Sequence, residues 1–183
     1  MHNSAERCDA PKCHPKTRVA VQGELVDWSK RGDKEKKIVW VTGPAGGGKT
    51  AILGSVAETC QKEGLLACGF FFSTFAKSVN RRYKRCLVPT LAYQLVQHKA
   101  LQSVGERILT CIDNDPAIFE KRLEEQFDQL LTQPLQDIMG DIQLPKVIIL
   151  IDGLDECQAE EHGDSPRSRD EATRVNEIGR AHV

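Results

Sequence analysis

The chain alternates between short apolar runs and longer segments whose apolar residues recur at helical spacing. The apolar runs cover residues 38–41, 65–73 and 146–151, and the first reads "IVWV". Short runs of this kind, rich in β-branched or aromatic residues and bounded by polar or glycine-rich sequence, are typical of strands covered on both faces. We therefore expect three buried strands.

Helical spacing fills most of the chain around these runs. Residues 17–30 predict one helix, and a second helix is expected from near Lys49 to about Glu63, with Gly64 as its stop. Between residues 80 and 139 the pattern predicts helices only. Those helical segments are residues 90–98, 104–112 and 117–133, the last with an apolar stripe of Ile118, Leu123, Phe127, Leu130 and Leu131.

The order strand, helix, strand, helices, strand predicts an α/β protein with a parallel sheet flanked by helices. We expect this domain to span residues 17–157. Residues 1–16 are polar and contain two prolines, which indicates a loose N-terminal leader. Residues 158–183 are polar and contain no further strand pattern, so we expect a tail that is not the natural continuation of the domain.

Composition narrows the classes of function. A net charge of −1 over 183 residues provides no overall field for nucleic acid or an acidic membrane, so neither partner is expected. Neither a membrane-length apolar run nor a signal peptide is evident, which favours a cytoplasmic protein. The 7 cysteines form no CxxC pair, and this favours reduced thiols over a zinc site.

The sequence "GPAGGGKT" fits the phosphate-loop pattern G-x-x-x-x-G-K-[ST] and lies between a predicted strand and a predicted helix. Glycine is favoured where backbone N–H groups must surround a triphosphate, because a Cβ atom would block that approach. The start of the following helix adds N–H groups and a positive dipole end. The candidate nucleotide-binding residues are Gly43, Pro44, Ala45, Gly46, Gly47, Gly48, Lys49 and Thr50.

Within this loop, Lys49 is expected to reach the β- and γ-phosphates, and the Thr50 hydroxyl is expected to bind Mg²⁺. The second half of such a site is an acid at the tip of a buried strand. Asp152 ends the run "VIILID" and is the candidate magnesium ligand. Glu156 is the first choice as the base that activates water, with Asp155 as its accessory.

Other readings of the loop stay open at this point. A guanine-reading N-K-x-D sequence is absent, and the base of the nucleotide cannot be read from the chain. A small-molecule kinase would carry the same loop beneath a lid with arginines, and the basic cluster Arg81, Arg82, Lys84 and Arg85 is the one dense candidate. A third reading is a non-catalytic interaction fragment with a vestigial nucleotide site.

Several sequence blocks together resemble a known family. They are "CHPKTRVAVQGELVDW", "IVWVTGPAGGGKTAI", "FFFS", "NRRYKRCLVPTLAYQL" and "VIILIDGLDEC". They resemble the NACHT-type P-loop NTPase domain of fungal NOD-like receptors and the similar nephrocystin-3-like N-terminal domain. The resemblance implies an ATP–Mg²⁺ switch of the STAND class, which forms a homo-oligomer in the full-length protein. It also implies that hydrolysis by this truncated chain is weak or absent.

The same resemblance implies a gap in the sheet. In related ATPases a sensor strand lies between the phosphate-loop strand and the acidic-motif strand, and the polar residues after Cys157 do not predict it. We therefore expect the sheet to stop after the acidic-motif strand. The first and third predicted strands would then have no partner between them, and their edges would need other cover.

Overall fold

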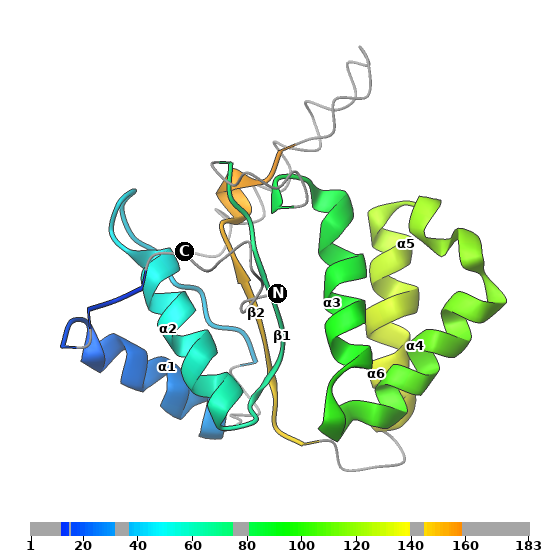
Figure 1. Cartoon of the computed structure of the whole chain (residues 1–183), viewed down its shortest axis with the longest axis horizontal. Helices are drawn as coiled ribbons and strands as arrows, with labels where there is room; N and C mark the ends of the chain where they lie inside the picture. Colours follow the sequence, from blue (N-terminus) through cyan, green and yellow to red (C-terminus); the bar gives the residue numbers. More distant parts are fainter. Residues whose placement is uncertain (1–11, 15, 32–36, 75–80, 140–144, 159–183) are drawn as a thin grey trace.

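The structure is a computed structural model, and it describes residues 12–14, 16–31, 37–74, 81–139 and 145–158. Two of the predicted strands form a parallel pair at the centre of the fold, β1 (Leu66–Phe71) and β2 (Ile148–Asp152) (Figure 1). In their register Leu66 lies opposite Ile148, and Phe71 lies opposite Asp152. Because the strands are parallel, both carboxyl ends reach the same edge of the sheet.

Helices cover both faces of this sheet (Figure 1). α1 (Val19–Arg31) and α2 (Lys49–Lys62) lie on one face. The other face carries α3 (Leu87–Val96), α4 (Gln102–Asn114), α5 (Leu123–Phe127) and α6 (Gln133–Met139). Short 3-10 turns are Lys84–Cys86, Lys99–Leu101, Pro116–Glu120 and Leu154–Glu156, and a π-helical turn spans Asp128–Thr132. The predicted α/β class is confirmed, with a sheet of two strands in the described part of the chain.

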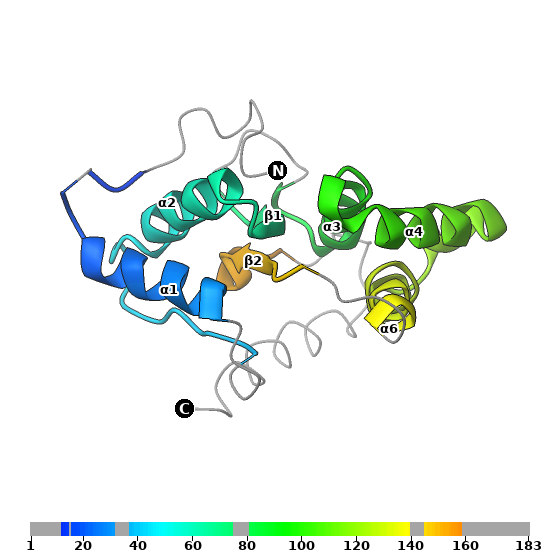
Figure 2. The same ribbon diagram turned by 90° about the horizontal axis from the view of Figure 1, so that it is seen from below.

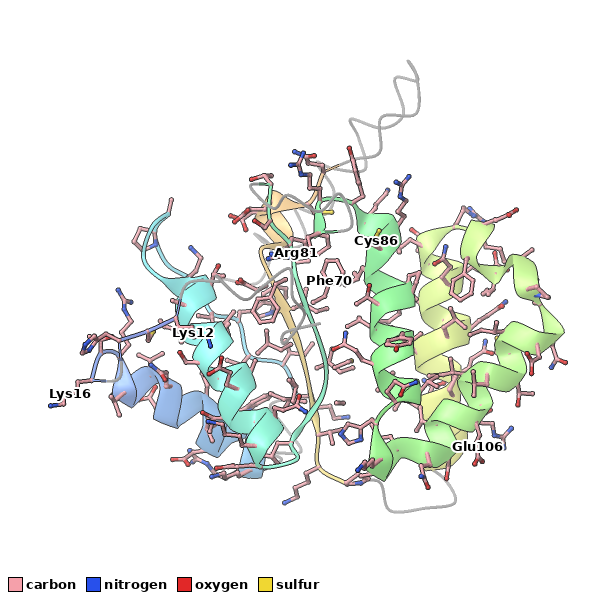
Figure 3. All side chains as sticks on the ribbon, viewed as in Figure 1. Lys12, Lys16, Phe70, Arg81, Cys86 and Glu106 are labelled. Carbon is pink, nitrogen blue, oxygen red and sulfur yellow. The ribbon has the colours of Figure 1, made fainter. Side chains whose placement is uncertain are left out.

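Buried side chains form two clusters, one on each face of the sheet. The α2-side core includes Val26, Ile52, Val56, Leu66, Phe71 and Leu150. The α3-side core includes Cys68, Phe70, Phe72, Leu91, Leu95, Val104, Ile108 and Leu130. Successive side chains of a strand point to opposite faces, so β1 contributes to both clusters. Figure 3 shows Phe70 between β1 and α3, and its ring packs edge-on against Phe72 with centroids 4.7 Å apart.

The outer edge of β1 is covered by a side chain of α3. The Gln94 amide donates to the Gly69 carbonyl at 3.0 Å and accepts from the Gly69 N–H at 3.2 Å. An uncovered strand edge would invite pairing with another chain. Gln94 therefore satisfies the strand at its midpoint and joins α3 to the sheet.

α2 begins and ends where the sequence predicts. Its first residue follows Gly48, and Ile52, Val56 and Cys60 form its buried stripe. The helix ends at Lys62, and Gly64 follows with a φ of 72° that favours glycine. The helix expected over residues 17–30 is likewise confirmed as α1.

The expected first strand is wrong. Residues 37–44 contain no strand, and Ile38, Val39 and Trp40 are 71%, 40% and 60% exposed. A strand needs hydrogen-bonding partners along its edge, and in the described part of the chain β2 pairs with β1 alone. The expected gap between the first and third apolar runs accounts for this difference, since the first run has no neighbouring strand to bind.

The helical stripe expected over residues 117–133 is only partly correct. Ile118, Leu130 and Leu131 are buried in the α3-side core, but Phe127 is 45% exposed. The segment is not one helix: a 3-10 turn ends at Glu120, and the chain is extended at its C-cap before α5 begins. This break and the π-helical turn change the helical phase, so the 3.6-residue spacing no longer selects one face.

Within the described residues, no helix is long and apolar enough to span a membrane. The same residues hold no group of three or more histidine, cysteine or acidic side chains suited to a metal ion. The described cysteines form no disulfide. Burial raises the pKa of the Cys68 thiol to about 12, so this side chain is held neutral inside the α3-side core.

Candidate functional site

The candidate phosphate loop, residues 43–50, connects the extended segment 37–42 to the first turn of α2. Two of its glycines adopt the left-handed region, with φ of 72° at Gly46 and 80° at Gly48. Residues with a Cβ atom adopt this region at a cost of about 1–2 kcal/mol. The glycines therefore allow the tight turn that leads into α2.

Close backbone contact requires another glycine of the loop. The Gly47 N–H donates to the Pro44 carbonyl at 3.0 Å, which closes a tight turn. A Cβ atom on Gly47 would lie 2.9 Å from the same Pro44 oxygen. This separation is shorter than real Cβ atoms show, so any larger residue at position 47 would open the turn.

Lys49 folds back over the loop. Its Nζ donates to the carbonyl of Gly43 at 2.9 Å and to the carbonyl of Pro44 at 3.2 Å. Gly48 caps the start of α2, and no described side chain accepts a hydrogen bond there as a cap. When a helix has no side-chain cap, its first backbone N–H groups and the positive end of its dipole remain available to an anion. The ammonium group and the start of α2 are thus brought together at one loop.

A second cation lies against the same loop. The Arg18 guanidinium is close to Gly48, with its Cζ 3.7 Å and its Nε 3.8 Å from where a Gly48 Cβ would be. Among the described non-glycine residues, Arg18 has the only positive φ, at 54°. The sequence motif did not identify this residue, because its place beside the loop depends on how α1 packs on α2.

The acidic half of the site lies at the carboxyl end of β2. Asp152 is buried, with 6% of its surface exposed, and its carbonyl accepts a hydrogen bond from the Phe72 N–H at 2.9 Å. Gly153 follows with a φ of 72°, and a Cβ atom there would lie 2.9 Å from the Phe72 carbonyl oxygen. Position 153 therefore favours glycine for two reasons: its backbone is left-handed, and it lies against the Phe72 carbonyl.

The two further acids have different surroundings. Asp155 is exposed. Glu156 is half-buried, and its Oε2 accepts a hydrogen bond from the Thr74 N–H at 3.0 Å and another from the Thr74 hydroxyl at 3.3 Å. Thr74 was not a predicted site residue. Its signal in the sequence is weak, a polar side chain just after a buried strand, where parallel sheets place ligand-binding residues.

The loop and the acids lie at the same end of the sheet (Figure 1). α2 runs antiparallel to β1 and β2, so its first turn lies beside the carboxyl ends of the strands. Figure 3 shows Arg81 at this end, and its Nε donates to the Phe71 carbonyl at 3.0 Å. The metal pairing of Thr50 with Asp152 stays a prediction, as do the roles of Asp155 and Glu156.

One known family matches most of the chain. Residues 19–171 match the family described as Nephrocystin 3, N-terminal. The chain belongs to the nephrocystin 3 N-terminal family. This confirms the resemblance to the nephrocystin-3-like N-terminal domain. No curated protein and no solved structure matches the chain.

The match to the nephrocystin 3 N-terminal family includes the loop, both strands and the acids. It begins at the first residue of α1 and extends past the last described residue, 158. The expected domain boundary at residue 157 stays a prediction, because residues 159–183 lie outside the described part of the chain.

Proposed function

We propose that this member of the nephrocystin 3 N-terminal family binds a nucleoside triphosphate, ATP by resemblance, with Mg²⁺, as the nucleotide module of a NACHT-type switch of the STAND class. The loop at residues 43–50 carries the proposal. Its backbone reverses at glycines, leads into a helix start without a side-chain cap, and holds the Lys49 ammonium against its own carbonyls.

The loop suits an anion better than it suits a structural turn. An ordinary turn does not require glycine beside the Pro44 carbonyl, a lysine folded inward and Arg18 beside Gly48. Backbone N–H groups, a helix start and two cations are the groups that stabilise phosphate oxygens in proteins. On this proposal the N–H groups of residues 45, 46 and 48–50 hold the phosphates, and Lys49 exchanges its carbonyl contacts for phosphate oxygens.

The acids complete the proposed site. Thr50 and Asp152 would hold Mg²⁺, which neutralises charge on the phosphates. Asp152 is buried at the end of β2, where carboxylates are uncommon unless they are paired or bind metals. Glu156 would accept a proton from water, with Asp155 nearby. Hydrolysis is proposed to be weak or absent in this chain.

The proposal is tested by titrating the 183-residue chain with ATP–Mg²⁺ and following its thermal unfolding. Ligand at about 100 times its dissociation constant stabilises a folded protein by roughly 2.7 kcal/mol. Lys49→Ala should weaken binding by about 10- to 100-fold, because a hydrogen bond to a charged group contributes about 1.5–3 kcal/mol. Lys62→Ala is the matched control, since Lys62 lies at the opposite end of the same helix.

The outcomes separate the alternatives. Stabilisation of the parent and of Lys62→Ala, with loss in Lys49→Ala, supports the proposal. Equal responses from all three proteins would refute the role of Lys49. Absence of any response in the folded parent would favour the interaction fragment with a vestigial site. Transfer of phosphate to a small metabolite, measured beside phosphate release, would identify a kinase.

A further inference from the structure

Residues 81–83, which we call the clasp, connect the chain that leaves β1 to the chain that leaves β2. At β1 the contacts come from Arg81: its carbonyl accepts from the Ser73 N–H at 2.9 Å, and its Nε donates to the Phe71 carbonyl at 3.0 Å. Arg81 is half-buried at the carboxyl end of the sheet (Figure 3). Hydrogen bonds from a charged donor are roughly twice as strong as those between neutral groups. Arg81 therefore holds the end of β1 through both its backbone and its side chain.

The far end of the clasp is bound to the chain that follows the acidic turn. The Arg82 carbonyl accepts from the Gln158 N–H at 2.8 Å, and Tyr83 and Gln158 form a parallel β-bridge. Beyond the clasp, the 3-10 turn Lys84–Cys86 leads directly into α3, which lies on the opposite side of β1 from α2 (Figure 2). The clasp thus connects the acidic turn to β1 and to the start of α3.

Asp152 depends on the stretch of β1 that Arg81 holds. Phe71 lies opposite Asp152 in the register of the sheet. The next residue, Phe72, donates its N–H to the Asp152 carbonyl at 2.9 Å, and it lies between the two residues that Arg81 binds, Phe71 and Ser73. The main chain of the acid is therefore fixed by a peptide that Arg81 holds on both sides.

We propose that Arg81 is a positioning residue for the metal half of the site, and that through the clasp it holds the Asp152 carboxylate ready for Mg²⁺. The inference rests on the proposed function. Changing a residue that orients a metal ligand typically lowers metal affinity by about 10–100-fold. Arg81 contacts neither the nucleotide nor the metal in this role, so the binding of metal-free ATP should not depend on it.

The first experiment measures the dissociation constant of ATP by titration calorimetry, once with Mg²⁺ and once with EDTA. The ratio of the two constants gives the contribution of the metal. In Arg81→Ala this ratio should fall by about tenfold, while the constant in EDTA stays within about twofold of the parent. A merely structural loss would weaken both constants alike. Arg85→Ala is the matched control and should keep the parent ratio, because Arg85 belongs to the same basic cluster but is exposed, with its guanidinium over the Tyr83 ring.

Arg81→Lys separates the hydrogen bond from the charge. Lysine keeps the positive charge but has a methylene group where arginine has its Nε–H, so the ratio should fall as it does in Arg81→Ala. A parent-like ratio in Arg81→Lys would overturn the role of the Nε bond. An unchanged ratio in Arg81→Ala, or an equal loss in both constants, would overturn the inference. Absence of ATP binding to the parent in both conditions would refute the proposed function, and the inference with it.

The second experiment needs no variant. If the clasp favours Mg²⁺ binding, then Mg²⁺ binding must favour the closed clasp by the same factor. Amide hydrogen exchange at Ser73 and Gln158 reports the two bonds that the clasp accepts, and it should be slower with ATP–Mg²⁺ than with ATP in EDTA. Slower exchange in the phosphate loop, with no change at Ser73 and Gln158, would overturn the inference and leave nucleotide binding intact. Unchanged exchange throughout the chain would refute both.

Discussion

Gly153→Ala should destabilise this protein more than any ordinary glycine-to-alanine change, because two separate costs meet at that position. The φ of 72° lies in the left-handed region, where a Cβ atom costs about 1–2 kcal/mol. The new Cβ would also lie 2.9 Å from the Phe72 carbonyl oxygen and 3.3 Å from the Phe72 Cβ. Both contacts are tighter than ordinary van der Waals contact.

Gly64→Ala is a matched control for the backbone term. Gly64 has the same φ of 72°, but a Cβ atom there would meet nothing within 4 Å. Alanine at both positions also restricts the unfolded chain, which offsets about 0.4–1 kcal/mol. We expect a net loss of about 1 kcal/mol for Gly64→Ala. The difference between the two variants then isolates the contact with Phe72.

The steric cost of the new Cβ atom depends on whether the Phe72 carbonyl can move away from it. The Phe72 carbonyl belongs to a residue whose N–H donates to Asp152 at 2.9 Å, so the peptide cannot shift without disturbing the end of the sheet. Forcing extra carbon into a packed site costs typically about 1–3 kcal/mol. The free energy of unfolding of Gly153→Ala should therefore fall by about 2–4 kcal/mol relative to the parent.

Urea denaturation followed by far-UV circular dichroism measures both variants. For a small domain the free energy falls by about 1–3 kcal/mol per molar urea, so the midpoint of Gly153→Ala should lie roughly 0.5–1.5 M below that of Gly64→Ala. The slope of the transition should be the same in both. Equal midpoints would refute the reasoning, since they would mean that the turn after Asp152 relaxes without cost.

Two further predictions concern the helices on the α3 side of the sheet. Leu91→Ala should lower the free energy of unfolding by about 2–5 kcal/mol, because Leu91 is 1% exposed. Leu109→Ala is the control: this position is 47% exposed, so the free energy of unfolding should change by about 0.5 kcal/mol or less. Equal urea midpoints for the two variants would contradict this prediction. Burial lowers the pKa of His98 in the folded state. The contribution of the neutral imidazole to the free energy of unfolding is therefore complete above pH ~6.5 and is lost as the pH falls through the folded pKa. Urea midpoints at pH 7.5 and 5.5 should therefore differ less in His98→Gln than in the parent, and an equal difference would disprove the assignment.

Features that depend on local spacing could be predicted from the sequence. β1 follows from its apolar run, because a strand buried on both faces needs apolar residues at every position. β2 follows from a similar run, although it is less buried than expected, with Ile149 45% exposed. α2 follows from its buried stripe and the glycine after its end. The candidate loop follows from the order of its glycines, with Lys49 and Thr50 closing the motif.

Features that depend on a distant partner could not be predicted. The run at residues 38–41 has the composition of a strand, but composition does not supply a neighbouring strand. Thr74 and Glu156 meet across 82 positions, and no spacing rule relates them. The place of Arg18 beside Gly48 likewise depends on how α1 docks on α2. In each case the missing information is tertiary.

The division of the buried side chains into two cores has a consequence for how this sequence can change. Distant sites that share no contacts contribute to stability additively, whereas neighbours do not. Substitutions in α2 and in α4 belong to different cores, so natural variation on one side leaves the other unconstrained. β1 has no such freedom, because its residues are shared between the two cores, so substitutions in this strand must satisfy two sets of neighbours at once.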